Sequence, residues 1–270
     1  MTVATHPTVT ARGGAKATLG RVFTSETVKL SSLPAYMVSF VSALIVLVGF
    51  GLMSAWARII QSNELPQIGA LEPGAVLAGL QGAQLLVALT AAVFATSEYA
   101  QQTVQPTYLA TPLRVPVLAA KAGLMAVVGL VVGAVGGVLA LAGASLVLAD
   151  TNLAFGISVD FGAQLVFGAG LYLAAVAVLG LAVGTIVRHT VAGLLSMVGL
   201  LGIAPLVLGA VPVEWIRNAT AYLPSTAGLL ILQQDGVSSV LGPWSGLGVT
   251  DLWALAALIG AAVFVRLTDA

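Results

Sequence analysis

Long apolar stretches without a single charge dominate this sequence and limit the folds that it can adopt. Only 7% of the 270 residues are charged and 59% are hydrophobic, whereas a soluble globular domain carries about 25% charged residues. Too few polar side chains remain to cover a surface that faces water, so lipid must surround most of the chain. Because helices satisfy their backbone hydrogen bonds internally in lipid, we expect an all-α integral membrane protein.

The apolar stretches predict six transmembrane helices, because one crossing of a bilayer takes about 20 helical residues. The third stretch is longer than one crossing needs, which predicts a helix that tilts or projects beyond the lipid. The sixth is short, since Asp251 and Arg266 bound it. We expect a flexible tail over residues 1–16 and a single transmembrane domain over 17–270. The predicted spans are about 35–57, 74–96, 117–149, 161–187, 190–211 and 251–266.

The positive charges predict the orientation of these helices. With the N-terminus in the cytoplasm, the outer segments hold only Arg58 and Arg217. The inner segments hold the other eight bases, which are Arg12, Lys16, Arg21, Lys29, Arg114, Lys121, Arg188 and Arg266. Because basic loops stay on the inner side of the membrane, this bias places both termini in the cytoplasm. The acids divide the other way, with Glu64, Glu72, Asp150, Asp160, Glu214, Asp235 and Asp251 outside.

Two segments on the inner side are more polar than simple connections need to be. The first, residues 17–33, mixes apolar side chains with polar ones that include Arg21, Glu26 and Lys29. We expect an amphipathic helix that lies in the membrane interface there. The alternative is a basic flank that anchors the first span. Pro34 then allows a sharp turn into that span.

The second polar segment, TSEYAQQTVQPTYLATPLRVPVLAAK at 96–121, joins the second and third spans. Ser97 is a suitable N-cap for a short helix with Glu98 in its first turn. Thr111-Pro112 is typical of the start of the next helix. We therefore predict two short helical pieces that project below the membrane. The alternative is a solvated connection.

This second segment resembles the cytoplasmic loop of ABC-2-type transporter permeases, and two other stretches are similar to the same family. SETVKLSS, near the N-terminus, resembles the family's interfacial helix, and the stretch from Leu241 to the end resembles its final span. The three matches follow the family's order along the chain. The residues that carry them are Ser25, Glu26, Lys29, Leu30, Ser97, Glu98, Tyr99, Thr103, Leu109, Pro112, Arg114, Ala120, Lys121, Pro243, Trp244, Gly246, Asp269 and Ala270.

The resemblance implies the membrane subunit of an ATP-driven exporter in the cytoplasmic membrane of a bacterium. It implies a pair of permease chains, as a homodimer or a heterodimer, and a separate ATPase that binds ATP and Mg²⁺. RGGAKAT at 12–18 has Ala15 where the second glycine of a phosphate-binding loop belongs, so this chain carries no such loop. By the same resemblance, short extracellular helices between spans five and six close the outer side of the path. The loop residues expected to couple to the ATPase are Glu98, Gln101, Gln102, Thr103, Thr107 and Arg114.

Small and polar residues within the predicted spans are candidates for a substrate path. Ser39, Ser42 and Met53 recur at helical spacing in the first span, and Gln81 and Gln84 share a face of the second. The alternative role is helix packing, for which small residues and glutamines are also suited. A lining with so few hydrogen-bonding groups predicts an amphipathic cargo, such as a drug, a peptide or a lipid. Close packing is the expected role of a ladder in the third span, which consists of Gly129, Gly133 and Gly137.

The sequence disfavours several other functions. No ionisable residue is expected at the centre of a span, which argues against proton-driven transport. The only histidines are His6 and His189, and the chain has no cysteine, so no catalytic centre or metal site is expected. A net charge of zero gives no bulk attraction to nucleic acid. The main alternative function is a membrane-embedded sensor or immunity protein that binds a peptide without pumping, and a channel is a weaker one.

Overall fold

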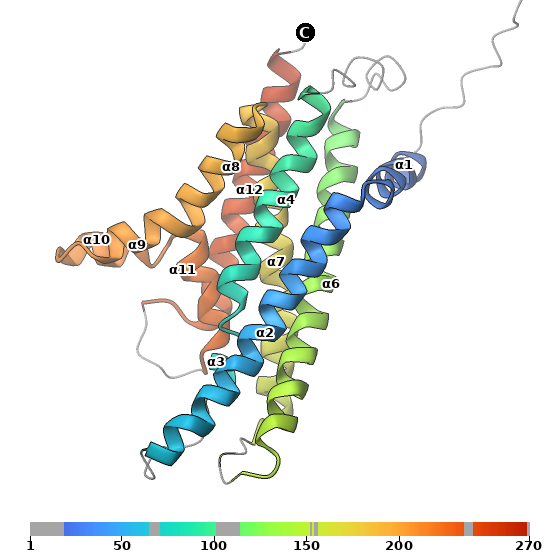
Figure 1. Cartoon of the computed structure of the whole chain (residues 1–270). Coiled ribbons are helices and arrows are strands. Elements are labelled where there is room, and N and C mark those ends of the chain that lie inside the picture. The colour runs from blue at the N-terminus through green and yellow to red at the C-terminus, as the bar shows by residue number, and fades with distance from the viewer. Residues whose placement is uncertain are drawn as a thin grey trace, which may run out of the picture.

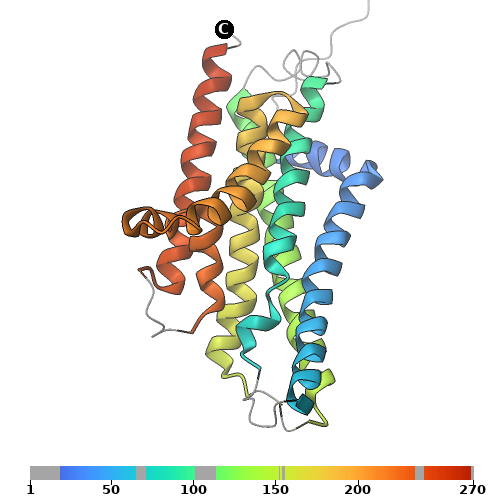
Figure 2. The ribbon, with the colours of Figure 1, turned by 60° about the vertical axis from the view of Figure 1, so that its left-hand side comes forward.

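The predicted all-helical architecture is confirmed for the part of the chain that the structure describes. The computed structural model describes residues 19–64, 71–100, 114–151, 153, 156–234 and 240–268. Every regular element among them is a helix. Six helical segments in these ranges are long and apolar enough to cross a membrane, as expected of a multi-pass membrane protein. Figures 1 and 2 show the long helices side by side in one bundle.

The helices follow one another in a simple order along the chain. They are α1 (Leu19–Ser32), α2 (Pro34–Glu64), α3 (Pro73–Val76), α4 (Leu80–Ala100), α6 (Arg114–Leu148), α7 (Val159–Val187), α8 (Thr190–Val198), the π-helical turn η1 (Gly199–Ile203), α9 (Ala204–Gly209), α10 (Glu214–Thr220), α11 (Pro224–Leu229), the 3-10 turn η2 (Leu230–Leu232) and α12 (Pro243–Thr268).

A helix long and apolar enough to cross a membrane lies at each of the six predicted spans, but three of the predicted bounds are wrong. The second was expected to start at 74, whereas a turn at 77–79 separates α3 from α4. At this turn a Cβ on Gly79 would lie 2.7 Å from the carbonyl oxygen of Val46, so the chain bends where it presses on α2. The first and sixth spans extend beyond their predicted ends, to Pro34–Ser62 and Pro243–Leu267. In both cases a charged residue, Arg58 or Asp251, lies inside the helix that it was expected to end.

Helix α7 lies at the centre of the bundle, between α6, α4 and α12 (Figure 1). In its most apolar stretch 72% of the residues are buried, against 22% for α2 and for α12. This difference makes α7 the core of the chain and leaves α2 and α12 at its periphery. Large apolar side chains therefore point outward from the peripheral helices, including Val38, Ile45, Leu252 and Ile259. Such a surface is suited to lipid and not to water.

Glycines allow the backbones of these helices to approach one another closely. Positions 129 and 133 on α6 face the backbone of α7: a Cβ on Gly129 would lie 2.5 Å from the carbonyl oxygen of Leu173, and one on Gly133 would lie 2.7 Å from the Cα of Gly170. Gly137, by contrast, has room for a Cβ at ordinary contact distance. The packing role predicted for the ladder is therefore confirmed at its first two positions.

The fifth span bends where a proline follows a π-helical turn. Thr190–Gly209 comprises α8, η1 and α9, and Pro205 is the second residue of α9, which follows the π turn. Because proline has no N–H to donate to the preceding turn, the helix widens locally. Beyond it, α9 and α10 project from the side of the bundle (Figure 2).

Replacing Gly133 with alanine tests the close packing of α6 against α7. The added methyl group has no space beside Gly170, so we expect the thermal midpoint in detergent to fall by an amount equivalent to about 1–3 kcal/mol. Gly123→Ala is the matched control, because it lies on the same helix with nothing within 4 Å of the added carbon. Equal midpoints for the two variants would contradict the packing described here.

Candidate functional site

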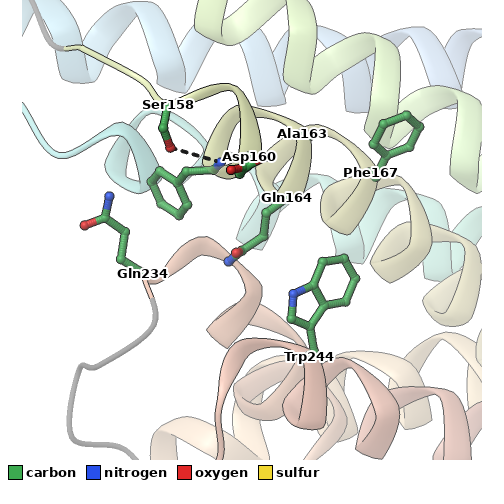
Figure 3. A pocket seen from close by; sticks show the side chains of 8 residues that line it. Ser158, Asp160, Ala163, Gln164, Phe167, Gln234 and Trp244 are labelled. Carbon is green, nitrogen blue, oxygen red and sulfur yellow. Dashed lines mark hydrogen bonds between the residues drawn. The ribbon is translucent and has the colours of Figure 1, made fainter.

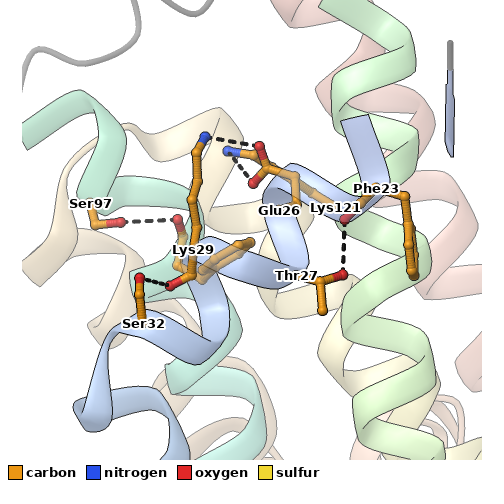
Figure 4. A network of polar contacts seen from close by, with 8 residues as sticks. Phe23, Glu26, Thr27, Lys29, Ser32, Ser97 and Lys121 are labelled. Atoms are coloured by element: carbon orange, nitrogen blue, oxygen red, sulfur yellow. Dashed lines mark hydrogen bonds and ion pairs between the residues drawn. The ribbon is translucent and has the colours of Figure 1, made fainter. Parts of the chain in front are cut away.

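A buried carboxylate joins α1 to the rest of the bundle. Glu26 on α1 is only 1% exposed, although α1 lies at the side of the bundle, next to α6 (Figure 1). Its Oε1 lies 2.9 Å from the Nζ of Lys29, one turn further along α1, and its Oε2 lies 3.9 Å from the Nζ of Lys121 on α6 (Figure 4). Lys121 is itself 6% exposed. The carboxylate thus links α1 to the first turns of α6.

Aromatic side chains complete this contact from α2 and α4. The ammonium group of Lys121 lies 5.5 Å from the ring centroid of Phe94, a distance at which a cation is attracted to an aromatic face. Tyr36 packs edge-on against Phe94, and its hydroxyl donates to the Oγ of Ser97 at 3.2 Å. We call Glu26, Lys29, Tyr36, Phe94, Ser97 and Lys121 the Glu26 cluster. It holds four helices together at the end of the bundle where α4 ends and α6 begins.

The Glu26 cluster joins helices by compensating buried charges. Two ammonium groups surround one carboxylate, so the positive charge of Lys121 is compensated where water is scarce. Removing either partner of a buried pair leaves an uncompensated charge and costs about 3–5 kcal/mol. Within the described ranges, no group of three or more His, Cys, Asp or Glu side chains is placed to hold a metal ion.

The predicted coupling residues lie beside this cluster or outside the described residues. Glu98 is part of the last turn of α4, and Arg114 is the first residue of α6, although the structure does not describe their side chains. Arg21 is likewise placed on α1 by its backbone alone. The helix start predicted at Thr111-Pro112 lies outside the described residues. So do the remaining coupling residues, which are Gln101, Gln102, Thr103 and Thr107.

The helix start predicted at Ser97 is wrong. Ser97 lies inside α4, which continues without a break to Ala100. Its hydroxyl donates to the carbonyl oxygen of Phe94 at 3.1 Å, a bond that a serine within a helix can form to the preceding turn. The hydroxyl is therefore used inside the helix and does not cap a new one.

The candidate path residues on α2 lie at or near the surface of the chain. Met53 is 58% exposed, and Ser39 and Ser42 are half-buried. The hydroxyl of Ser39 donates to the carbonyl oxygen of Ala35 within the helix. A path that included these residues would have to run along the outside of one chain.

The two glutamines of α4 do not face the same surroundings. Gln81 is exposed, whereas Gln84 is 1% exposed and its Oε1 accepts a hydrogen bond from the hydroxyl of Tyr172 on α7. Gln84 therefore takes part in helix packing, the alternative role considered for it, and of the two only Gln81 remains accessible.

A cavity of about 590 Å³ lies near the N-terminal end of α7, away from the Glu26 cluster (Figure 3). Ser158 caps α7 there by accepting a hydrogen bond from the N–H of Phe161 at 3.3 Å. Gln164 donates from Nε2 to the carbonyl oxygens of Ile231 and Gln233, both at 3.0 Å, and so fixes the segment before α12. The cavity is lined by Ser158, Asp160, Phe161, Ala163, Gln164, Phe167, Gln234 and Trp244. Its mixture of aromatic, amide and carboxylate groups is typical of ligand sites, and the sequence pattern alone gave no sign that these segments meet.

The structure corrects the place expected for Asp251. Asp251 was placed outside the membrane, but it lies within Pro243–Leu267, and its side chain is exposed on the surface of α12.

A search of protein-family models found no match to this chain, and neither did a search of curated proteins. The similarity to ABC-2-type permeases accordingly rests on the motifs quoted above.

A double-mutant cycle tests the link between α1 and α6. Lys121→Met removes the buried ammonium group, so we expect the free energy of unfolding to fall by about 3 kcal/mol. Lys121→Met should cost less when it is made in the Glu26→Gln variant than in the parent chain. The difference between these two costs is the coupling free energy, which we expect to be about 1–3 kcal/mol. Lys29→Met is the matched control, because the Lys29 side chain is 42% exposed and its pair with Glu26 should contribute less than about 1 kcal/mol. Additive effects of the first two changes would contradict the contact.

Proposed function

We propose that this chain is the transmembrane permease subunit of an ABC transporter, which exports an amphipathic substrate with energy from a separate ATPase. The observation that carries this proposal is the place of the Glu26 cluster. It joins α1 and α2 to the last turns of α4 and the first turns of α6. Those turns flank the polar segment 101–113, which contains most of the residues expected to contact the ATPase.

The cluster gives a route by which movement of that segment would reach the membrane helices. In this mechanism, ATP-driven closure of the ATPase pushes on the connection between α4 and α6. Phe94 and Lys121 move with the ends of these helices and carry Tyr36 and Glu26 with them. Because close-packed contacts transmit displacement with little compression, α1 and α2 tilt as one unit. ATP and Mg²⁺ remain on the partner, and this chain supplies α1 and α2 as the lever that tilts.

The charges of the described residues support a cytoplasmic position for this end of the chain. Arg188 packs over the ring of Phe264, which brings the end of α7 beside the end of α12. Lys29, Lys121, Arg188 and Arg266 belong to the ends of α1, α6, α7 and α12 that lie toward the Glu26 cluster. The opposite ends of α2, α6 and α7 carry Glu64, Asp150 and Asp160 with one base, Arg58. By the positive-inside rule, both termini face the cytoplasm of a bacterial inner membrane, and α1 lies in its interface.

A second permease chain would complete the path. In the first span the candidate path residues lie on or near the outer surface of α2, so cargo in contact with them would pass between two chains and not through one. We propose a homodimer, with a heterodimer as the alternative. In this arrangement α11 enters the bundle level with Tyr172, in the middle of α7. The segment of α10 and α11 closes the path on the side away from the Glu26 cluster.

Reconstitution with an ATPase encoded beside this chain tests the proposed coupling. Glu98→Lys, or glycine at both 101 and 102, should lower transport-coupled ATP hydrolysis in lipid about fivefold or more, because each weakens the contact with the ATPase. Glu64→Lys is the matched control: it reverses an exposed charge at the other end of α2 and should leave hydrolysis unchanged.

Two outcomes would count against the proposal. Parental hydrolysis and transport in both loop variants would show that the segment does not couple. A chain that binds a peptide but never associates with an ATPase is what the sensor or immunity alternative predicts.

A further inference from the structure

A carboxylate on the surface of α12 lies at the depth of the middle of the bundle. The hydroxyl of Thr250 donates to the carbonyl oxygen of Pro224 at 2.9 Å. A Cβ on Gly228 would lie 2.7 Å from the Oγ1 of Thr250. That Cβ would also meet the ring of Tyr172. Because Tyr172 stands midway along α7 (Val159–Val187), Thr250 and its neighbour Asp251 lie level with the centre of this span.

The surroundings of Asp251 on its own chain do not compensate its charge. The side chain is exposed, and it forms no hydrogen bond or ion pair within the ranges that the structure describes. A charged side chain near the centre of a bilayer costs about 3 kcal/mol or more, so such residues face a cavity or a charged partner and mark substrate pathways. A carboxylate at this depth therefore calls for a cation opposite it.

The face of α12 around Asp251 is suited to an organic cation. Residues 244, 248, 251 and 255 follow one another at helical spacing and share one face. Apart from its two chain neighbours and the backbone of its own helix, Gly248 has no atom within 4 Å of the position where a Cβ would stand, which leaves a recess between Trp244 and Asp251. Trp244 is 51% exposed, so its ring is accessible. An aromatic face beside a carboxylate is the arrangement that binds quaternary ammonium and related cations.

The same face leads into the cavity at the end of α7. Trp244 lines that cavity together with Phe167 and Asp160, and none of its eight lining residues is basic. Trp244 and Asp251 are separated by two helical turns, or about 10 Å along the helix. A cation in the cavity would therefore meet the carboxylate of Asp160 and the aromatic rings, and Asp251 lies beyond the cavity on the same face of α12 as Trp244.

We propose that Asp251, Trp244 and Gly248 form a binding site for the positively charged group of an amphipathic cargo. The proposal rests on the function proposed above, and it narrows the cargo to hydrophobic cations. Asp251 supplies the counter-charge, Trp244 supplies the aromatic face, and Gly248 supplies the space. Neutral and anionic amphiphiles of the same size bind less well, because they leave Asp251 without a partner.

Equilibrium binding of tetraphenylphosphonium to the purified full chain in lipid nanodiscs tests this site without an ATPase or ATP. Tetraphenylborate has the same shape and the opposite charge, so we expect it not to compete. Asp251→Asn removes the counter-charge and should raise the Kd for tetraphenylphosphonium about tenfold or more. Gly248→Leu keeps the charge but fills the recess, and it should raise the Kd as well. Asp150→Asn, at an exposed end of α6, is the matched control and should not change the Kd.

Each remaining result of this experiment would overturn the site. A parent chain that does not bind tetraphenylphosphonium, or that binds tetraphenylborate equally well, is not a receptor for cations. A parental Kd in both Asp251→Asn and Gly248→Leu would place the cation elsewhere. Cation binding that survives Asp251→Asn while the dimer dissociates would assign Asp251 to a contact between two chains. Because no nucleotide is involved, loss of the ATPase partnership would leave these measurements unaffected.

Discussion

Surrounding lipid is the constraint on which this structure depends, because lipid removes the hydrophobic force that would otherwise draw helices together. Close backbone contacts take its place. Gly129 and Gly133 on α6 meet the backbone of α7, and Gly180 and Gly184 on α7 meet the backbone of α4 near Ala88 and Ala92. Helix α7 can therefore be approached from two sides without side chains between the backbones. The large apolar side chains of the outer helices point outward, toward the surrounding lipid.

The same constraint explains why the polar contacts are few and why they carry the proposed function. A polar group away from water needs a partner, and the two main examples join helices that are distant in sequence: Glu26 with Lys121, and Tyr172 with Gln84. The first ties the lever to the bundle, and the second fixes α4 against α7 at mid-depth. Asp251 lacks such a partner among the described residues. In the proposed site, a bound ligand supplies the positive charge that compensates this carboxylate.

The long apolar stretches were sufficient to predict the six helices, since length and composition decide whether a helix can cross a bilayer. They could not place the helix ends, because Arg58 and Asp251 were taken as boundaries and the helices continue through them. The candidate site was harder to predict. Nothing local shows that Lys121 is buried against Glu26, and the spacing of Gln81 and Gln84 could not show that only one of them faces inward. Such facts depend on contacts between segments far apart in the chain.

The central claim is that the connection between α4 and α6 lies in the cytoplasm, with the acidic ends of the bundle outside. The chain contains no cysteine, so single cysteines can be introduced without a background signal. In intact cells a membrane-impermeant maleimide should label Asp150→Cys and should not label Gln102→Cys until the membrane is permeabilised. Labelling of Gln102→Cys in intact cells, with Asp150→Cys protected, would contradict the orientation, and with it the lever, the ATPase contact and the direction of transport.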